Sequence, residues 1–492
     1  MEKTKTAIIL IGLTVLAFCL RWYLMPSHLF FGPEQGRDFL VVRDIVVNHK
    51  FTLIGSKTDV DGVFHGPVYY YLAASPFALS RGNPVAVMAF FIAIQSLGVY
   101  LAYLLAFELT QKKRAGYIAA SVYASSYLLV VYSRWLSNPP LSIPLSLLFM
   151  LCLVRFIRRR QWYLIAAAFV YGLFGQAEFI NYLLIAVIGV FIIFAYWKQS
   201  RKTTLAVWLC ASVVGLATSF VTYFLFDLRH DFLVSKGVID LLSGRGGYQL
   251  YFITSAAGAF RVLMEQAAQM VGLSGWIWGF VVTIAVMCTL CLSTRKNSVL
   301  WILAIWIWVP PVLFAILRHG MLDQLYAGIV VGFVILLAVS IEWVWEKSRI
   351  VGMGSLVIIV LLNIFSVMQN LPDNHNVFFQ PQQPAVRYTD QLAAIDWIYA
   401  RAQDKPFSLQ SYTIPYFWQD AWTYLFGYNG FRKYGYLPDN KGRKLIFVII
   451  QRDTLDPNFQ KNWLEKTVSA WGSKINEVTI GEYRVVELAV NP

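Results

Sequence analysis

The chain of 492 residues could hold roughly two or three soluble domains, but its composition excludes an ordinary soluble protein. Hydrophobic residues make up 58% of the sequence and charged residues 14%, which is typical of a membrane protein that crosses the bilayer many times. The net charge of +14 does not indicate a nucleic acid partner, because the basic residues occur in short clusters between apolar segments. Membrane topology explains this distribution better.

Apolar segments of roughly 20 residues, the length that crosses a bilayer, recur along most of the chain. The first of them continues through Arg21 and Trp22 without a small-residue cleavage site, so we interpret it as a retained helix and not as a signal peptide. We expect about eleven transmembrane helices, near residues 6–25, 84–108, 115–132, 139–156, 161–177, 180–197, 204–225, 268–292, 298–316, 325–344 and 351–369.

The basic clusters all fall on one side of the membrane if these spans alternate in direction. They are Lys3/Lys5, Lys112–Arg114, Arg155–Arg160, Lys198–Lys202, Arg295–Lys296 and Lys347–Arg349. The positive-inside rule makes this side cytoplasmic. We therefore expect a cytoplasmic N-terminus and three outer segments, at residues 26–83, 226–267 and 371–492.

The last outer segment differs in composition from the rest of the chain. After a linker rich in Pro, Asn and Gln at residues 371–385, helical patterns alternate with strand-like runs, with helices near 388–403 and 457–471 and strands at 407–412, 445–451 and 478–488. We expect a transmembrane domain at residues 1–370 and a small α/β domain at 371–492. We find no internal repeat of the kind that marks the halves of transporters.

The first outer segment predicts an amphipathic helix that begins near Glu34. Its polar side would present Glu34, Arg37, Asp38 and Asp44 to water or to a cavity, and its apolar side would carry Phe39, Leu40, Val42, Val46 and Val47. The alternative is an interfacial helix whose charges are only solvated. Taken singly, Asp44, Asp59 and Asp61 are best explained as solvated loop residues.

Three further outer turns, YSRWLSNPP (132–140), GQAEFINY (175–182) and LRHGMLDQLY (317–326), place polar groups near the bilayer. Arg134 and Glu178 are either snorkelling side chains or groups that face a cavity. Arginine side chains and a carboxylate at one surface suit a negatively charged lipid substrate. The Cys288–Cys291 pair has CxxC spacing but lies inside a predicted span without helper ligands, so we expect no metal site there.

Four motifs in this order carry a family resemblance: GPEQGRD with VVRDI, LIGSKTDVDGVFHGPVYYYL, RGNPVAV, and YSRWLSNPPLSIPLSLLF. They resemble bacterial membrane glycosyltransferases of the C-type fold, in the branch related to protein O-mannosyltransferases and the lipid A aminoarabinose transferase. The resemblance covers residue 1 to about 370 and extends more weakly into the tail. It implies a mainly α fold with interfacial helices in the first outer segment.

The resemblance also implies an activity. Such an enzyme transfers a sugar from a polyprenyl-phosphate donor to an acceptor hydroxyl on the outer face of the bacterial cytoplasmic (inner) membrane, with inversion. The acceptor stays open between a glycan, a lipid and a protein. No cofactor is expected to be required, a divalent metal stays possible, and no nucleic acid partner is expected.

The family's essential acid matches Glu34, with Asp38 as its rival one helical turn later. The resemblance makes Arg37, His65, Arg134 and Arg318 candidates for holding the leaving phosphate. Donor-binding candidates in the same turns are Asn138, Glu178 and His319; Glu178 stands where a histidine is usual, which marks either a different acceptor or a second acid. Tyr69 and Tyr70 would form part of a sugar-stacking wall or of an interfacial aromatic belt.

Three other classes of protein stay open. A flippase or transporter of lipid-linked glycans would place charges in mid-span and have matching halves. A glycan polymerase or ligase would share the membrane placement and much of the chemistry. A membrane anchor would leave the function to its terminal domain, which has no nucleophile motif and no phosphate-binding loop.

Overall fold

The computed structural model describes residues 2–158, 160–243, 250–294, 297–318, 320, 322–372, 384, 386–439 and 445–490. The chain divides into two compact units. Unit 1 comprises Met1–Tyr23, Phe51–Leu72 and Ala89–Met368, and unit 2 comprises Leu24–Lys50, Ala73–Met88 and Gln369–Pro492. Each unit is described separately. The linker expected at 371–385 lies almost entirely outside the described residues, and so do Arg159, Arg295 and Lys296 of the basic clusters.

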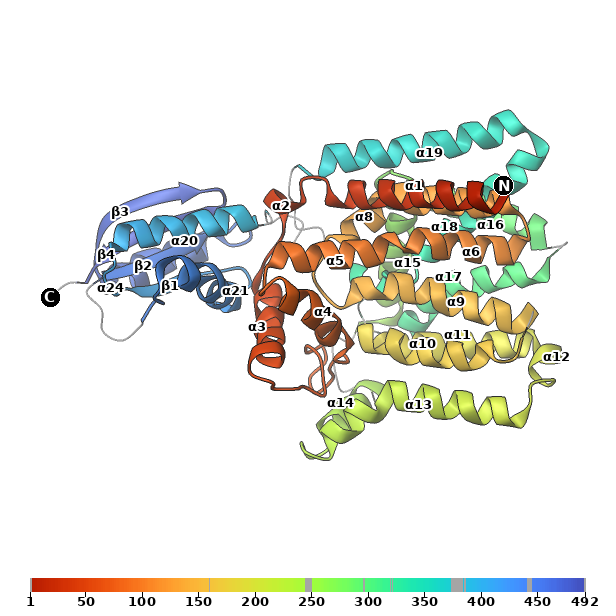
Figure 1. The fold of residues 1–492 in the computed structure, drawn as a ribbon, viewed down its shortest axis with the longest axis horizontal. Coiled ribbons are helices and arrows are strands. Elements are labelled where there is room, and N and C mark those ends of the chain that lie inside the picture. The colour runs from red at the N-terminus through yellow and green to blue at the C-terminus, as the bar shows by residue number, and fades with distance from the viewer. Residues whose placement is uncertain are drawn as a thin grey trace. The chain divides into compact units, whose positions relative to one another are not determined.

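Unit 1 is helical, and its long helices run along a common direction (Figure 1). Its elements are α1 (Glu2–Trp22), α6 (Gly98–Thr110), α7 (Lys113–Ser125), α8 (Tyr127–Ser133), η1 (Pro139–Leu141), α9 (Ser142–Arg158), α10 (Tyr163–Ala177), α11 (Ile180–Ala195), α12 (Trp197–Ser200), α13 (Leu205–Asp227), α14 (Leu233–Leu242), α15 (Phe252–Met270), α16 (Trp276–Thr294), η2 (Ser298–Leu300), α17 (Trp301–Leu317), η3 (Asp323–Tyr326) and α18 (Val331–Lys347). Helices α4 (Val68–Leu79), α5 (Pro84–Ser96) and α19 (Arg349–Asn370) each run from one unit into the other.

The apolar helices confirm a multi-pass membrane protein but not the count of eleven spans. In the described part of the chain, seven helices are long and apolar enough to cross a membrane, and an eighth span results if α7 and α8 count as one. The helices α10 and α11 are apolar but shorter. Helix α15 lies mostly in the segment expected to be an outer loop at 226–267, because its polar residues hid it from a search for apolar runs.

The span expected at 115–132 is broken, because α7 and α8 meet at an angle of 57°. At the break, backbone carbonyls lack the N–H donors that a continuous helix would supply. Arg21 donates hydrogen bonds to the carbonyls of Tyr123 and Ala124, at 3.2 and 3.1 Å, and to Ser133 Oγ at 3.0 Å. The buried guanidinium of Arg21 in α1 therefore donates hydrogen bonds to carbonyls that have no helical donor at the bend.

Unit 2 contains a four-stranded sheet with order β1-β2-β4-β3. Its elements are α2 (Met25–His28), α3 (Pro33–Val47), α20 (Tyr388–Ala402), β1 (Ser408–Tyr412), α21 (Asp420–Leu425), η4 (Phe426–Gly430), α22 (Phe431–Tyr434), β2 (Leu445–Gln451), α23 (Pro457–Trp463), η5 (Leu464–Val468), α24 (Ser469–Trp471), β3 (Ser473–Ile480) and β4 (Tyr483–Ala489). The segment expected as one strand at 478–488 is a hairpin, since the chain turns at Gly481 with φ +56°.

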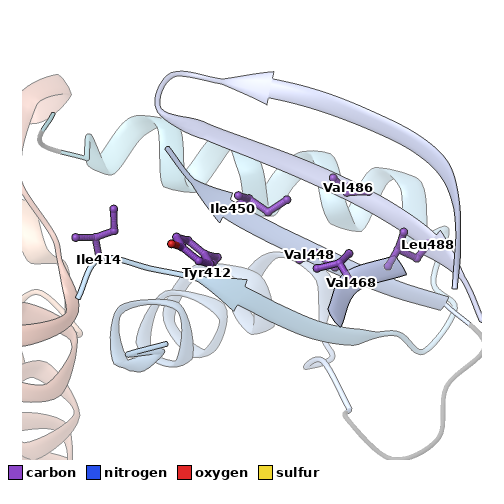
Figure 2. Close-up of a cluster of buried hydrophobic side chains, with 7 residues drawn as sticks. All are labelled: Tyr412, Ile414, Val448, Ile450, Val468, Val486 and Leu488. Atoms are coloured by element: carbon purple, nitrogen blue, oxygen red, sulfur yellow. The ribbon is translucent and has the colours of Figure 1, made fainter. Parts of the chain in front are cut away.

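Both faces of the central strand β2 are buried, which explains its continuous apolar run LIFVII. One face packs Val448 and Ile450 with Val486 and Leu488 of β4 and with Tyr412 of β1 (Figure 2). On the other face, Phe447 makes an edge contact with Trp397 of α20. β1 pairs parallel to β2, while β4 pairs antiparallel to β2 and β3. The expected α/β character of this segment is confirmed.

Helix α3 packs closely on α21, and glycine makes this possible. A Cβ added at Gly36 would lie 2.2 Å from the backbone N of Ala421, so no larger residue fits without moving a backbone. Phe39 adds an edge contact to the ring of Tyr424, with centroids 5.2 Å apart. The small residue and the aromatic residue together fix α3 within unit 2.

Candidate active site

The candidate catalytic residues of unit 2 lie at the start of α3. Pro33 occupies the first turn, and the Gln35 side chain accepts a hydrogen bond from the Gly32 N–H at 3.1 Å. This capped start holds Glu34 in the first turn of the helix. Arg37 follows at the spacing that puts two side chains on one helix face. Glu34, Arg37 and Asp38 are called the Glu34 group below.

Burial raises the pKa of Glu34 to about 7, with Arg37 opposing and Asp38 reinforcing this shift. A carboxylate with this pKa is partly ionised at neutral pH and can both accept and release a proton. The sequence could identify Glu34 as an acid in a special motif, but it could not show the burial that adjusts its pKa.

Asp38 differs from Glu34 because it is ion-paired. Both Nε and Nη2 of Arg37 lie 2.9 Å from Oδ1 of Asp38, and the Asp38 side chain is 1% exposed. Asp38 does not face water, because it is buried on the side of α3 that carries Phe39 and Val42. The ion pair with the guanidinium occupies Oδ1 of Asp38.

A second polar cluster lies in unit 1 and is called the His65 group: Ser56, His65, Asn138, Ser142, Glu178 and Asn181. Glycine backbones position His65. Gly55 N–H donates to the carbonyl of His65 at 2.7 Å, and Gly66 N–H donates to the carbonyl of Gln176 at 2.9 Å. A Cβ at Gly66 would lie 2.4 Å from the Gln176 side chain, so the HGP motif holds His65 against the C-terminal end of α10.

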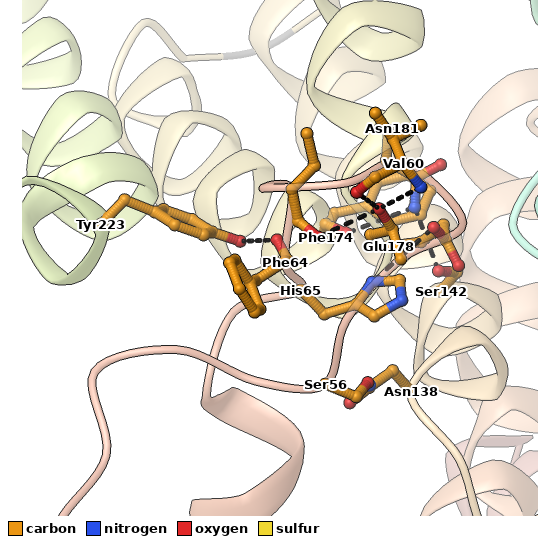
Figure 3. Close-up of polar contacts among 12 residues, drawn as sticks. Ser56, Val60, Phe64, His65, Asn138, Ser142, Phe174, Glu178, Asn181 and Tyr223 are labelled. Carbon is orange, nitrogen blue, oxygen red and sulfur yellow. Dashed lines mark hydrogen bonds and ion pairs between the residues drawn. The ribbon is translucent and has the colours of Figure 1, made fainter. Parts of the chain in front are cut away.

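His65 and Glu178 are close inside the protein. His65 Nδ1 lies 3.7 Å from Glu178 Oε1, and the side chains are 11% and 7% exposed (Figure 3). Burial raises the pKa of Glu178 to about 8, and the charge of Asp59 adds to this effect. Glu178 is therefore mainly protonated at neutral pH, and the contact is not an ion pair there.

The remaining polar side chains of this group connect three chain segments. Asn138 Nδ2 donates to Ser56 Oγ at 2.8 Å, and Asn181 Nδ2 donates to Ser142 Oγ at 3.1 Å (Figure 3). Ser56, Ser142 and Asn181 were not expected in the site from the sequence. For Ser142 and Asn181 the signal is a polar residue where the apolar segments of α9 and α11 begin, whereas Ser56 lies in a loop and has no such signal.

Tyr69, Tyr70 and Arg134 were also expected in the site from the sequence. Tyr69 and Tyr70 are buried, and Tyr69 stacks on Phe91 with centroids 5.3 Å apart, so a sugar-stacking role stays a prediction. Arg134 Nη1 donates to the carbonyls of Arg21 and Tyr23 at 3.0 and 2.5 Å, which commits this nitrogen to holding the end of α1.

The last two candidates come from one turn. Arg318 is exposed at the C-terminus of α17, and its carbonyl accepts a hydrogen bond from Leu250 N–H. His319 lies outside the described residues. In the described ranges, no three His, Cys, Asp or Glu side chains group closely enough to hold a metal ion. The metal requirement stays open.

Two comparisons with known proteins agree with the resemblance. Residues 64–224, less than half of the chain, match the model of the dolichyl-phosphate-mannose-protein mannosyltransferase family. The crystal structure of ArnT from Cupriavidus metallidurans in the apo state matches with a TM-score of 0.63 and 11% identity, covering 99% of this chain and 98% of that one. The chain has the C-type fold of membrane glycosyltransferases.

A second structure of ArnT from Cupriavidus metallidurans, bound to undecaprenyl phosphate, matches this chain with a TM-score of 0.61 and 11% identity. The match covers 98% of both chains. No curated protein sequence matches this chain. At 11% identity the structural likeness establishes the fold and leaves the donor, the acceptor and the residues' roles open.

Proposed function

We propose that this protein is a membrane glycosyltransferase that transfers a sugar from a polyprenyl-phosphate donor to an acceptor hydroxyl, on the extracytoplasmic face of a bacterial inner membrane. The observation that carries the proposal is Glu34, a carboxylate with a pKa raised by burial to about 7 beside an arginine. Undecaprenyl phosphate in one of the similar structures supports a lipid-linked donor.

Glu34 is the proton acceptor in the proposed reaction. As the acceptor hydroxyl gives its proton to the Glu34 carboxylate, its oxygen forms a bond to the anomeric carbon of the donor sugar. The bond between this carbon and the phosphate oxygen breaks, and polyprenyl phosphate leaves with the bonding electrons. A single displacement of this kind inverts the anomeric centre.

The leaving group is a phosphate anion, so cationic side chains stabilise it in the transition state. We assign this role to Arg37, with Asp38 as the positioning residue that holds the guanidinium through its ion pair. His65 and Arg318 are further candidates for binding phosphate. Because Glu178 is mainly neutral at pH 7, it can bind a sugar hydroxyl near a phosphate without repelling it.

The test is sugar transfer from radiolabelled polyprenyl-phosphate sugars in proteoliposomes, with wild type compared to Glu34→Gln and Asp38→Asn. We expect Glu34→Gln to lower the transfer rate about 100-fold or more, because a positioned base contributes roughly 10²–10⁴-fold. We expect it to retain donor binding. Asp38→Asn should lower the rate less, since Arg37 keeps its charge.

Asp44→Asn is the matched control. Asp44 lies on the same helix as Glu34, and its partly exposed carboxylate contacts Arg43 and Lys50. It should retain the wild-type rate. Unchanged transfer in Glu34→Gln would reject Glu34 as the base. Movement of the intact lipid-linked sugar across the bilayer without donor consumption would instead establish a flippase, and transfer of a whole glycan would establish a polymerase or ligase.

A further inference from the structure

Unit 2 contains a pocket of about 340 Å³ that belongs to neither the Glu34 group nor the His65 group. It is called the Arg81 pocket here. Helix α3, the end of α4 with the turn after it, and the helices α21, η4 and α22 line it. Its walls are apolar at Val46, Val47, Phe77 and Ala78 and aromatic at Tyr424 and Tyr428.

Three arginines give the pocket a strong positive charge. Arg43, Arg81 and Arg432 line it, and no aspartate or glutamate is among its lining residues. The nearest acid recorded for Arg43 is its neighbour Asp44, at 3.7 Å. Guanidinium groups beside an apolar wall suit a ligand that combines an anionic phosphate with a hydrocarbon part.

The pocket is preformed by contacts between distant parts of the sequence. Arg81 and Gly82 form a turn with φ of +55° and +86°. The Tyr424 hydroxyl donates to the Gly82 carbonyl, and Arg432 donates to the Arg81 carbonyl. The Arg432 guanidinium also lies over the Tyr428 ring, 4.6 Å from its centroid. The Arg432 guanidinium and the backbone of Arg81 are therefore held in place before a ligand arrives.

Chain connectivity places the pocket at the depth of lipid headgroups. Arg81 precedes by three residues the apolar segment Pro84–Thr110, which is long enough to cross a membrane. At about 3.5 Å per residue, Arg81 lies within roughly 10 Å of the end of that span. Val47 and Leu79, which are 61% and 89% exposed, add apolar surface nearby. Arginines at this depth attract anionic lipids.

We propose that the Arg81 pocket binds the headgroup of an anionic membrane phospholipid, with the phosphate at the arginines and the first acyl carbons along Val47 and Phe77. The site is separate from the proposed sugar transfer. Lipid binding can be measured without any sugar donor, so failure of one proposal leaves the other testable.

The experiment uses native mass spectrometry of the full-length protein in neutral detergent, with phosphatidylglycerol or phosphatidylcholine as the added lipid. We expect wild type to prefer phosphatidylglycerol. Arg81→Gln with Arg432→Gln should weaken this binding roughly fivefold for each arginine removed. Phosphatidylcholine binding should not change. Arg81→Lys keeps the positive charge and should therefore retain the preference for phosphatidylglycerol. This result would show that the turn at Arg81 tolerates substitution.

Arg452→Gln is the matched control, since Arg452 is a 67% exposed arginine of the same unit that does not line the pocket. It should bind phosphatidylglycerol as wild type does. If Arg452→Gln lost as much phosphatidylglycerol binding as the pocket variants, the proposal would be overturned, because general surface charge would then explain the binding. The proposal also fails if wild type shows no preference, or if equimolar inorganic phosphate displaces the lipid, which indicates a site for free phosphate.

Discussion

The residue with the clearest chemical signature is Glu34. Its carboxyl group lies in the first turn of a helix, where the N-terminal backbone favours the ionised form, yet burial dominates and raises the pKa to about 7. Asp38, four residues later, pairs with Arg37 and lies on the buried side of the helix. Two acids in one motif thus have different environments, and this difference assigns them different roles.

A prediction at this scale concerns pH. Because only ionised Glu34 accepts a proton, we expect kcat/KM for sugar transfer to rise about tenfold per pH unit below pH ~7 and to level off above it. Initial rates in proteoliposomes between about pH 5 and 9 provide the measurement. A flat profile across pH 6 to 8 contradicts the assignment, and Asp44→Asn should show the wild-type profile.

At the scale of elements, the bend between α7 and α8 depends on one side chain of α1. Arg21 is fully buried and binds the carbonyls of Tyr123 and Ala124 near the bend, the hydroxyl of Ser133, and the carbonyl of Ala17 in its own helix. Inside a membrane, a carbonyl or hydroxyl that loses its hydrogen-bond donor has no water to take the donor's place. The arginine is therefore structural, although a charge at that depth often indicates a ligand.

We expect Arg21→Met to destabilise the protein by about 3 kcal/mol or more. Several buried acceptors lose their donor together, and each unsatisfied group costs roughly 1–3 kcal/mol. Thermal unfolding in detergent, monitored by circular dichroism, measures the effect. Arg160→Met serves as the comparison, because Arg160 is exposed and should change the melting temperature little. Equal melting temperatures for the two variants would show that the Arg21 contacts do not stabilise the bend.

At the scale of the whole molecule, two of the basic clusters contribute ion pairs between helices, besides their predicted role in membrane orientation. Arg114 forms a bidentate pair with Glu342 of α18, with distances of 2.6 and 2.8 Å, and Arg155 pairs with Glu108 of α6 at 3.1 Å. These arginines link neighbouring helices at the ends that carry the clusters. Positive charge in these clusters therefore also joins helices within unit 1, in addition to the topological role that we predict for it.

The proposed orientation can be tested by cysteine labelling in intact cells. We expect a membrane-impermeant thiol reagent to label a cysteine at Asp61, in the proposed outer segment, without permeabilisation. A cysteine at Lys202, in a proposed cytoplasmic turn, should react only after permeabilisation. Both would be introduced into a chain whose native cysteines, Cys19, Cys152, Cys210, Cys288 and Cys291, have been replaced by serine. The opposite pattern would reverse the proposed topology.

Composition and periodicity predicted the apolar helices and the α/β character of the terminal segment, whereas the C-type fold was predicted from the resemblance of four motifs to a known family. The sequence did not predict the broken α7–α8 span. Hydropathy averages over the bend at Ser126, while the donor that satisfies the bend, Arg21, lies far away in the chain. It also could not show that Asp38 is shielded from water, since periodicity treats every carboxylate as polar and does not reveal an ion pair.

For the candidate site, the sequence by itself determined which residue types are available: a carboxylate at Glu34, an arginine after it, and polar turns between apolar spans. Only the tertiary structure decided their chemical states. It buries Glu34 and so raises its pKa, it pairs Asp38 with Arg37, and it joins His65 to Glu178 through the close backbone approach that Gly66 permits. Proton affinity depends on solvent and charges within a few ångströms, and residues distant in the sequence supply both.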